Sequence, residues 1–154
     1  MVTSKSAFCL VVIEDEKIIG FVSGTENISM YYKEFLRKNF LKASIILFPK
    51  LSHPKIAKKI NETLFYPVKK EKDLPEAELL SIVVEKSYQG KGISLMLFEK
   101  MIDEFKKKKI NKFKVVVGSN LTAACRFYEK MGGVLHSEVE VHKGEKSRIY
   151  IWKI

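Results

Sequence analysis

Two glycines that follow an apolar run are the first residues of this chain whose types and spacing could do chemistry. Gly90 and Gly92 lie within residues 89–94, between the apolar residues 79–84 and a stretch with helical spacing. The first amides of a helix have no partner inside it, the helix dipole favours an anion there, and glycine lets the backbone approach a ligand closely. The segment therefore outlines a loop that could bind a phosphate group.

The glycines by themselves leave two interpretations open. The segment lacks the Gly-Lys-Ser/Thr ending of the common nucleotide loop and the three glycines of the dinucleotide fingerprint. An ordinary turn between a strand and a helix, without a ligand, would use the same two glycines. A second segment of the chain is needed to choose between them.

A second run of apolar residues also precedes a helical stretch. Residues 114–120 end in polar residues, the last of them Asn120, and the helical stretch that follows ends at Gly132. Asparagine caps helices readily, and Tyr128 within the helical stretch brings a phenolic hydroxyl that can donate a proton. This arrangement repeats the strand-loop-helix form of the first segment.

The two segments resemble motifs A and B of the GCN5-related N-acetyltransferase (GNAT) superfamily. Motif A reads Arg/Gln-x-x-Gly-x-Gly/Ala after a strand, and residues 89–94 match it except that Ser94, also small, holds the last position. Motif B places an asparagine, an alanine, a Phe-Tyr pair and a helix-ending glycine in this order. The corresponding residues are Asn120, Ala123, Phe127, Tyr128 and Gly132. The resemblance covers residues 7–25 and 75–154.

This resemblance implies an α/β (α+β) GNAT fold in a single domain over residues 1–154. Its centre would be a mixed, mostly antiparallel sheet, flanked by helices and split at the cofactor cleft. The superfamily has a strand and one or two helices ahead of its first hairpin, but only six residues precede the hairpin here. We therefore expect those elements to be missing or replaced by a helical insertion at about residues 26–72. The expected strands are residues 7–13, 18–24, 79–84, 114–120, 134–141 and 148–154.

The resemblance further implies an acetyl-CoA-dependent N-acetyltransferase, in which an amine acceptor attacks the thioester directly. The amides of residues 89–94 would bind the pyrophosphate of coenzyme A, and free backbone groups of residues 82–84 would pair with its pantetheine arm. Tyr128 would be the general acid that protonates the leaving thiolate, and Asn120 would cap its helix and contact the pantetheine chain. The implied cofactor-binding residues are Ile82, Val83, Val84, Gln89, Gly90, Lys91, Gly92, Ile93, Ser94, Asn120, Ala123, Phe127 and Tyr128.

Glu78 is the candidate general base. It lies 11 residues before Gln89, the offset at which the histone acetyltransferase branch of the superfamily carries its catalytic glutamate. A carboxylate at the mouth of a strand can be partly desolvated, which suits a base. Other branches use water or different carboxylates, so Glu26 is a rival. A charge that merely ends a strand is a third interpretation.

The composition restricts the class of protein. A chain of 154 residues with 46% hydrophobic and 30% charged residues can bury the core of one globular domain. It has neither an apolar run of about 18 residues nor a leader peptide, so we expect a soluble cytoplasmic protein. Cys9 and Cys125 lack metal-type spacing and are expected to be reduced. The histidines form no ligand set and no metal is expected; they are His53, His136 and His142.

Basic residues are concentrated between Tyr31 and Lys72, where eleven Lys or Arg residues stand against three Glu residues. Most of the chain's net charge of +10 therefore lies outside the two motifs. In this segment we expect one helix with Ser29 as its N-cap and a second helix over residues 53–64. The segment could be an acceptor-side lid, a basic face against an anionic membrane or substrate, or a pair of surface helices with solvated lysines.

The expected partner is a small-molecule or peptide amine acceptor. The basic segment would favour an anionic one, such as a nucleotide-linked amino sugar or an acidic peptide. A catalytically silent acyl-CoA-binding or regulatory domain is the alternative function. A nucleic-acid-binding module is a third, but no helix-turn-helix, zinc or aromatic RNA-binding signature accompanies the charge, so nucleic acid is not the expected partner. A homodimer is left open, and no transmembrane segment is expected.

Overall fold

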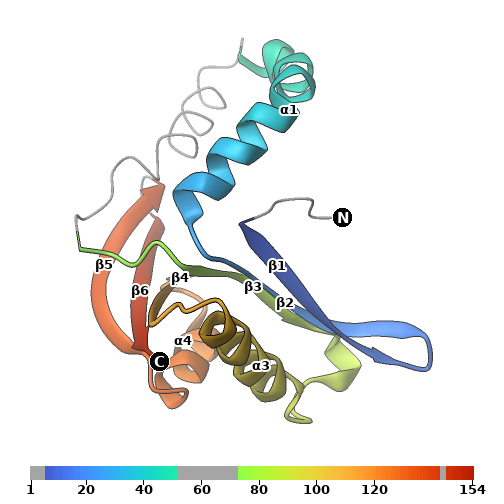
Figure 1. Cartoon of the computed structure of the whole chain (residues 1–154), viewed down its shortest axis with the longest axis vertical. Coiled ribbons are helices and arrows are strands. Elements are labelled where there is room, and N and C mark those ends of the chain that lie inside the picture. Colours follow the sequence, from blue (N-terminus) through green and yellow to red (C-terminus); the bar gives the residue numbers. More distant parts are fainter. Residues whose placement is uncertain (1–5, 52–72, 143–144) are drawn as a thin grey trace.

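Six strands form one mixed sheet in the computed structural model, which describes residues 6–51, 73–142 and 145–154 (Figure 1). Their order in the sheet is β1-β2-β3-β4-β6-β5. Within the described strands, β3 and β4 run parallel and the other neighbours run antiparallel. The sheet is thus mixed and mostly antiparallel, as the resemblance implies. The strands are β1 (Ala7–Glu14), β2 (Lys17–Thr25), β3 (Glu78–Val84), β4 (Lys112–Gly118), β5 (Val134–His142) and β6 (Glu145–Lys153).

The described helices are α1 (Ile28–Leu51), α3 (Ile93–Lys107), α4 (Thr122–Lys130) and the short 3-10 helix η2 (Lys86–Tyr88). Helix α1 joins β2 to the segment ahead of β3, whereas α3 and α4 follow β3 and β4 (Figure 1). None of the described helices is long and apolar enough to cross a membrane. The insertion expected between the hairpin and β3 is thus helical over the part that the structure describes, and the second expected helix, residues 53–64, lies outside it.

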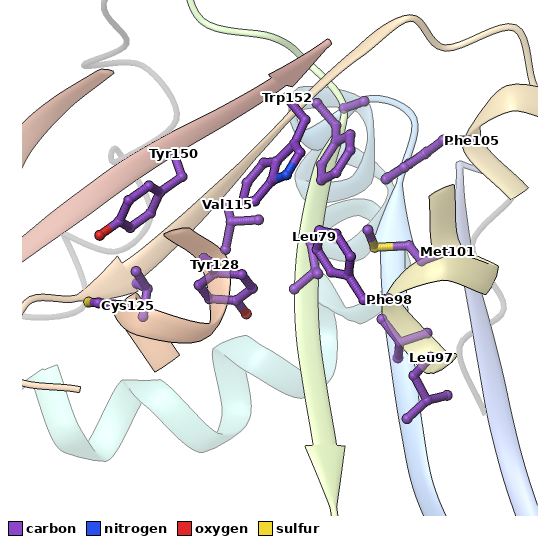
Figure 2. Packing of buried hydrophobic residues seen from close by; sticks show 14 residues of the cluster. Leu79, Leu97, Phe98, Met101, Phe105, Val115, Cys125, Tyr128, Tyr150 and Trp152 are labelled. Atoms are coloured by element: carbon purple, nitrogen blue, oxygen red, sulfur yellow. The ribbon is translucent and has the colours of Figure 1, made fainter. Parts of the chain in front are cut away.

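The core lies between the sheet and helices α3 and α4 (Figure 2). Helix α3 buries Leu97, Phe98, Met101 and Phe105, whose spacing places them on one side of the helix. Aromatic rings from β4 and β6 meet them there, and the rings of Phe113 and Trp152 stack with centroids 5.0 Å apart. Truncating a ring such as that of Phe98 in so dense a cluster costs about 3–5 kcal/mol. This core holds α3 and α4 on the same face of the sheet.

Strand β3 pairs with its two neighbours over very different lengths. Its pairing with β2 extends from Thr25 opposite Glu78 to Gly20 opposite Val84, with a bulge beside Leu80. Its pairing with β4 covers two positions, Glu78 opposite Lys114 and Leu79 opposite Val115. Beyond Leu79 the backbone of β3 that faces β4 has no described strand partner. The sheet is therefore split between β3 and β4, as the resemblance implies.

Helix α1 begins at Ile28, two residues earlier than a cap at Ser29 would place it, and the expectation that Ser29 caps it is wrong. Asn27 is the cap, because its Oδ1 accepts a hydrogen bond from the backbone N–H of Met30 at 2.8 Å. The N–H of Ile28 donates to the carbonyl of Glu76 at 2.9 Å, which ties the start of the helix to the chain just ahead of β3. The helix then runs past Pro49 to Leu51.

Strand β6 starts at Glu145, three residues before the predicted start at Arg148. Its first residues extend the pairing with β5, where Lys146 lies opposite Glu140 and Ser147 opposite Val139. These residues are charged or polar and give no apolar alternation. Their strand conformation is set by the partner strand rather than by their own side chains.

Candidate active site

A pocket of about 320 Å³ lies between the end of β3 and helix α4. Both segments singled out in the sequence contribute to its wall, although they are some thirty residues apart in the chain. The predicted residues that line it are Ile82, Val84, Gln89, Gly90, Ile93, Ser94, Ala123, Phe127 and Tyr128. Its wall also contains Tyr88 and Ala124, which the sequence did not single out. The split between β3 and β4 leads into this pocket.

The loop between η2 and α3 has the properties of an anion site. Gly90 and Gly92 have φ angles of 78° and 80°, a left-handed backbone conformation that residues other than glycine rarely adopt. An added Cβ at either position would have no heavy atom within 4 Å, so the loop backbone borders open space. Helix α3 has neither a side-chain cap nor an acidic residue in its first turn. Its first amides and its dipole are therefore directed at that space, which fits a pyrophosphate group.

Side chains around the loop hold its shape. Gln89 donates a hydrogen bond from Nε2 to the carbonyl of Val84 at 3.1 Å, which closes the loop onto the end of β3. The ammonium of Lys91 lies 4.7 Å from the ring centroid of Tyr88, a cation–π distance. The side chain of Lys91 is thus turned toward Tyr88, and Lys91 does not line the pocket. A hydrogen bond to Glu14 raises the pKa of Tyr88, so the hydroxyl stays protonated at neutral pH.

Tyr128 is the buried polar group of the pocket. Its side chain is only 5% exposed and packs against Phe98 and Trp152, with ring centroids 6.3 and 6.0 Å away (Figure 2). Burial, with a smaller effect of Cys125, raises its pKa to about 12. The phenol therefore carries its proton throughout the neutral range, so the proton is available to a thiolate that forms beside it.

Four predicted cofactor contacts do not line this pocket, and Lys91 is one of them. Asn120 is exposed, and the expectation that it caps α4 is wrong, because the cap position belongs to Leu121 and no side chain bonds there. The side chain of Asn120 instead lies close to Gly118. Val83 is 46% exposed, since side chains alternate along a strand and its neighbours Ile82 and Val84 face the pocket. Gly92 belongs to the loop but does not line the pocket. Backbone contacts from all four residues stay predictions.

Glu78 lies at the other end of β3, on the opposite face of the sheet from the pocket. Leu79 points into the core, so the alternation of side chains turns Glu78 to the face that α1 approaches. Its Oε2 lies 3.3 Å from Nζ of Lys114, and both side chains are largely buried, 12% and 4% exposed. Burial, followed by the charge of Glu78, raises the pKa of Tyr32 on α1.

Glu26, the rival base, is engaged elsewhere. Its Oε1 lies 2.7 Å from Nζ of Lys108, just past the C-terminal end of α3. The bond to Glu26 raises the pKa of Lys108. Glu26 does not line the pocket. Across the described residues, no group of three or more His, Cys, Asp or Glu side chains is arranged to hold a metal ion.

Several solved structures share this fold. One is a Bacillus anthracis protein provisionally assigned as a streptothricin acetyltransferase, in complex with acetyl coenzyme A (17% identity, TM-score 0.64, 99% of this chain and 65% of that one). Another is the ribosomal-protein-S18-alanine N-acetyltransferase from Escherichia coli (16% identity, TM-score 0.58, 99% of this chain and 72% of that one). A third is the PaiA N-acetyltransferase from Thermoplasma acidophilum in complex with coenzyme A (16% identity, TM-score 0.58, 97% of this chain and 62% of that one). This chain thus spans about two thirds of the length of these proteins.

Sequence comparison identifies the family directly. No curated protein matches the chain. The model of the acetyltransferase (GNAT) family, however, matches residues 2–133, most of the chain and both motifs. The split between β3 and β4, the glycine loop at the start of α3 and the buried tyrosine of α4 lie within that match. The chain therefore belongs to the acetyltransferase (GNAT) family.

Proposed function

We propose that this chain is an N-acetyltransferase, which transfers the acetyl group of acetyl-CoA to an amine acceptor. Acetyl-CoA is the cosubstrate of the GNAT family, and related folds have been solved with acetyl coenzyme A or coenzyme A bound. One observation carries the proposal: a glycine loop at a helix N-terminus and a buried, protonated Tyr128 line the same pocket. Transfer from a thioester needs both a site for the cofactor's anionic part and a proton for the leaving sulfur.

The described residues fit coenzyme A in three places. The amides at the start of α3 would hold the pyrophosphate, and Gly90 and Gly92 would allow it to come close. The backbone of β3 beyond Leu79 would bond the amides of the pantetheine arm, since its pairing with β4 has ended there. Ala123 and Phe127 on α4 would form the apolar wall opposite Ile82.

Glu78 and Tyr128 would move the protons of the reaction. Glu78, directly or through a water, would accept one proton from the acceptor's ammonium, and the amine nitrogen would then bond to the thioester carbonyl carbon. The carbon–sulfur bond breaks as that nitrogen gives up its second proton to water. Tyr128 would supply the proton that the sulfur needs and regain one from solvent. The products are an amide, the free thiol of coenzyme A and one released proton.

The acceptor in this proposal is a small-molecule or peptide amine that carries negative charge. The chain's net charge of +10 supports the anionic character, because a positive field raises the local concentration and the encounter rate of an anion. On helix α1 the exposed cations include Lys33, Arg37 and Lys38. Lys55, Lys58 and Lys59 of the basic segment lie outside the described residues. The homodimer and the cytoplasmic location stay predictions.

Two measurements on the full chain test the proposed function. Titration with coenzyme A should give saturable binding, and an acceptor screen with acetyl-CoA should release free thiol in step with loss of acceptor amine. Binding without turnover on any acceptor would instead support the catalytically silent acyl-CoA-binding domain. Salt-sensitive binding of DNA or RNA in place of coenzyme A would support the nucleic-acid-binding module.

Replacement of Glu78 with Gln tests the base. We expect Glu78→Gln to lower turnover by about 100-fold and to remove the acidic limb of the pH–rate profile, because an amide cannot accept the acceptor's proton. The affinity for coenzyme A should stay within about threefold, since Glu78 lies away from the pocket.

Glu26→Gln is the matched comparison, because the same change removes the charge of the rival base. Its pH–rate profile should keep the wild-type acidic limb. A profile in which Glu26→Gln loses the limb and Glu78→Gln keeps it would transfer the role to Glu26. If both variants kept it, water would be the acceptor of the proton.

A further inference from the structure

Lys114 is an unusual residue for the position that it occupies. It lies in β4 between Phe113 and Val115, both fully buried in the core, and its own exposed fraction is 3%. Its Nζ donates to the carbonyl of Pro75 and lies 3.3 Å from Oε2 of Glu78. Removing an ammonium and a carboxylate from water is costly, and apolar residues of similar size would often serve stability as well or better. Stability alone therefore does not account for this pair.

The place of the pair in the sheet relates it to the proposed reaction. Glu78 and Lys114 lie opposite each other in register, one position before the last pair that joins β3 to β4. They therefore lie beside the closed end of the split. The pocket opens on the face covered by α3 and α4, whereas Glu78 and Lys114 face the other side. A carbonyl carbon at the closed end would be within reach of an acceptor that arrives from the α1 face.

We propose that Lys114 is a positioning residue that holds Glu78 ionised and oriented as the base for the acceptor amine. This inference rests on the proposed N-acetyltransferase function and adds a residue to it. A buried carboxylate without a cation favours its neutral acid, which cannot accept a proton, whereas an ammonium 3.3 Å away favours the charged form. The bond to the Pro75 carbonyl fixes where the ammonium lies.

Groups from β2 and α1 also lie near Glu78. From β2 its register partner is Thr25, which does not titrate in the relevant range and whose hydroxyl donates to the carbonyl of Ser6 at 2.6 Å. From α1 the neighbouring group is Tyr32, which is half-buried and protonated at neutral pH. Lys114 from β4 places its ammonium 3.3 Å from the carboxylate oxygen. The acidic limb of the pH–rate profile should accordingly depend on Lys114.

The test compares pH–rate profiles of Lys114→Met, Lys114→Arg and the wild type, at saturating acetyl-CoA. In Lys114→Met the acidic limb should move to higher pH, so that kcat/KM at pH 6 relative to pH 9 falls by about tenfold more than in the wild type. Lys114→Arg should restore the wild-type limb in large part, because arginine keeps the charge. Lys112→Met, two residues along the same strand and exposed, should leave the profile unchanged.

Removal of the lysine takes away the ammonium 3.3 Å from a largely buried carboxylate, so folding must be followed separately. Melting temperature and coenzyme A affinity serve as the folding check, and Lys114→Gln replaces the methionine variant if that one does not fold. The double variant Glu78→Gln/Lys114→Met should regain melting temperature lost in the single variant, since it lacks both charges of the ion pair.

Three results would overturn the inference. One is an unchanged acidic limb in folded Lys114→Met or Lys114→Gln. Another is a folded Lys114→Arg that stays as inactive as the neutral variants, because lysine itself would then be the proton acceptor. The third comes from a readout without turnover: the carbon-13 signal of the Glu78 carboxyl titrating over the same pH range with and without Lys114. That titration tests the role of Lys114 even if no amine is acetylated. A lack of acetylation would contradict the proposed function but not the effect of Lys114 on Glu78.

Discussion

Gly92→Glu is expected to lower the affinity for coenzyme A by at least about 100-fold, or roughly 2.7 kcal/mol. A carboxylate would then lie where the first amides of α3 and the helix dipole favour the pyrophosphate, and like charges repel strongly in so close an approach. Isothermal titration or fluorescence titration with coenzyme A measures the loss directly. The expected size makes this the sharpest test of the anion site.

Gly132→Glu is the matched control for the Gly92 variant. Gly132 has a φ of 82°, almost the same as the 80° of Gly92, and an added Cβ there would also meet no atom within 4 Å. Both variants therefore carry the same backbone strain and the same added charge, but Gly132 follows the C-terminal end of α4. If the two variants lost affinity equally, strain would explain the result and the anion site would lie elsewhere.

Tyr128→Phe is expected to reduce kcat by about 100-fold while the dissociation constant of coenzyme A changes by less than about threefold. The ring, which packs against Phe98 and Trp152, is retained, and only the proton for the leaving sulfur is lost. Single-turnover measurements at saturating acetyl-CoA and acceptor separate this chemical step from binding. Equal single-turnover rates in the two proteins would remove Tyr128 from the mechanism.

The pH dependence adds a check on the same residue. Because burial raises the pKa of Tyr128 to about 12, the phenol keeps its proton well above neutral pH. Wild-type kcat should therefore show no loss from Tyr128 titration between pH 7 and pH 10. Tyr150→Phe is a useful comparison, since its hydroxyl donates to Oε1 of Glu129 at 2.7 Å and Tyr150 does not line the pocket. That change should leave kcat near the wild-type value.

The sequence alone determined the parts of the site that depend on local chemistry. Two glycines between an apolar run and an amphipathic stretch predict a loop with left-handed residues at a helix start, and Gly90 and Gly92 have that conformation. The spacing of apolar residues in α3 likewise predicts which side of that helix is buried. These features arise from residues within one or two helical turns of each other, so their pattern is visible in one stretch of sequence.

Local signals did not select the helix caps correctly. Ser29 and Asn120 were predicted to cap helices, but the cap positions belong to Asn27 and Leu121. Several residues near each helix start could adopt the cap conformation, and their energies differ by about 1 kcal/mol or less. At α1 a long-range bond from Ile28 to Glu76 sets the start of the helix. A tertiary contact of similar strength can therefore move a helix start by one or two positions.

The partner of Glu78 was decided by the tertiary structure alone. In the sequence Lys114 is a lysine beside an apolar run, in a chain rich in lysines, and no local feature marks it as buried. The parallel register of β3 and β4 brings its ammonium to within 3.3 Å of the Glu78 carboxylate. The tertiary structure likewise decided that Tyr88 and Ala124 line the pocket, because the directions of η2 and α4 relative to the sheet place them there. Chain geometry over tens of residues sets these distances, whereas residue type sets only what each group can do once it is there.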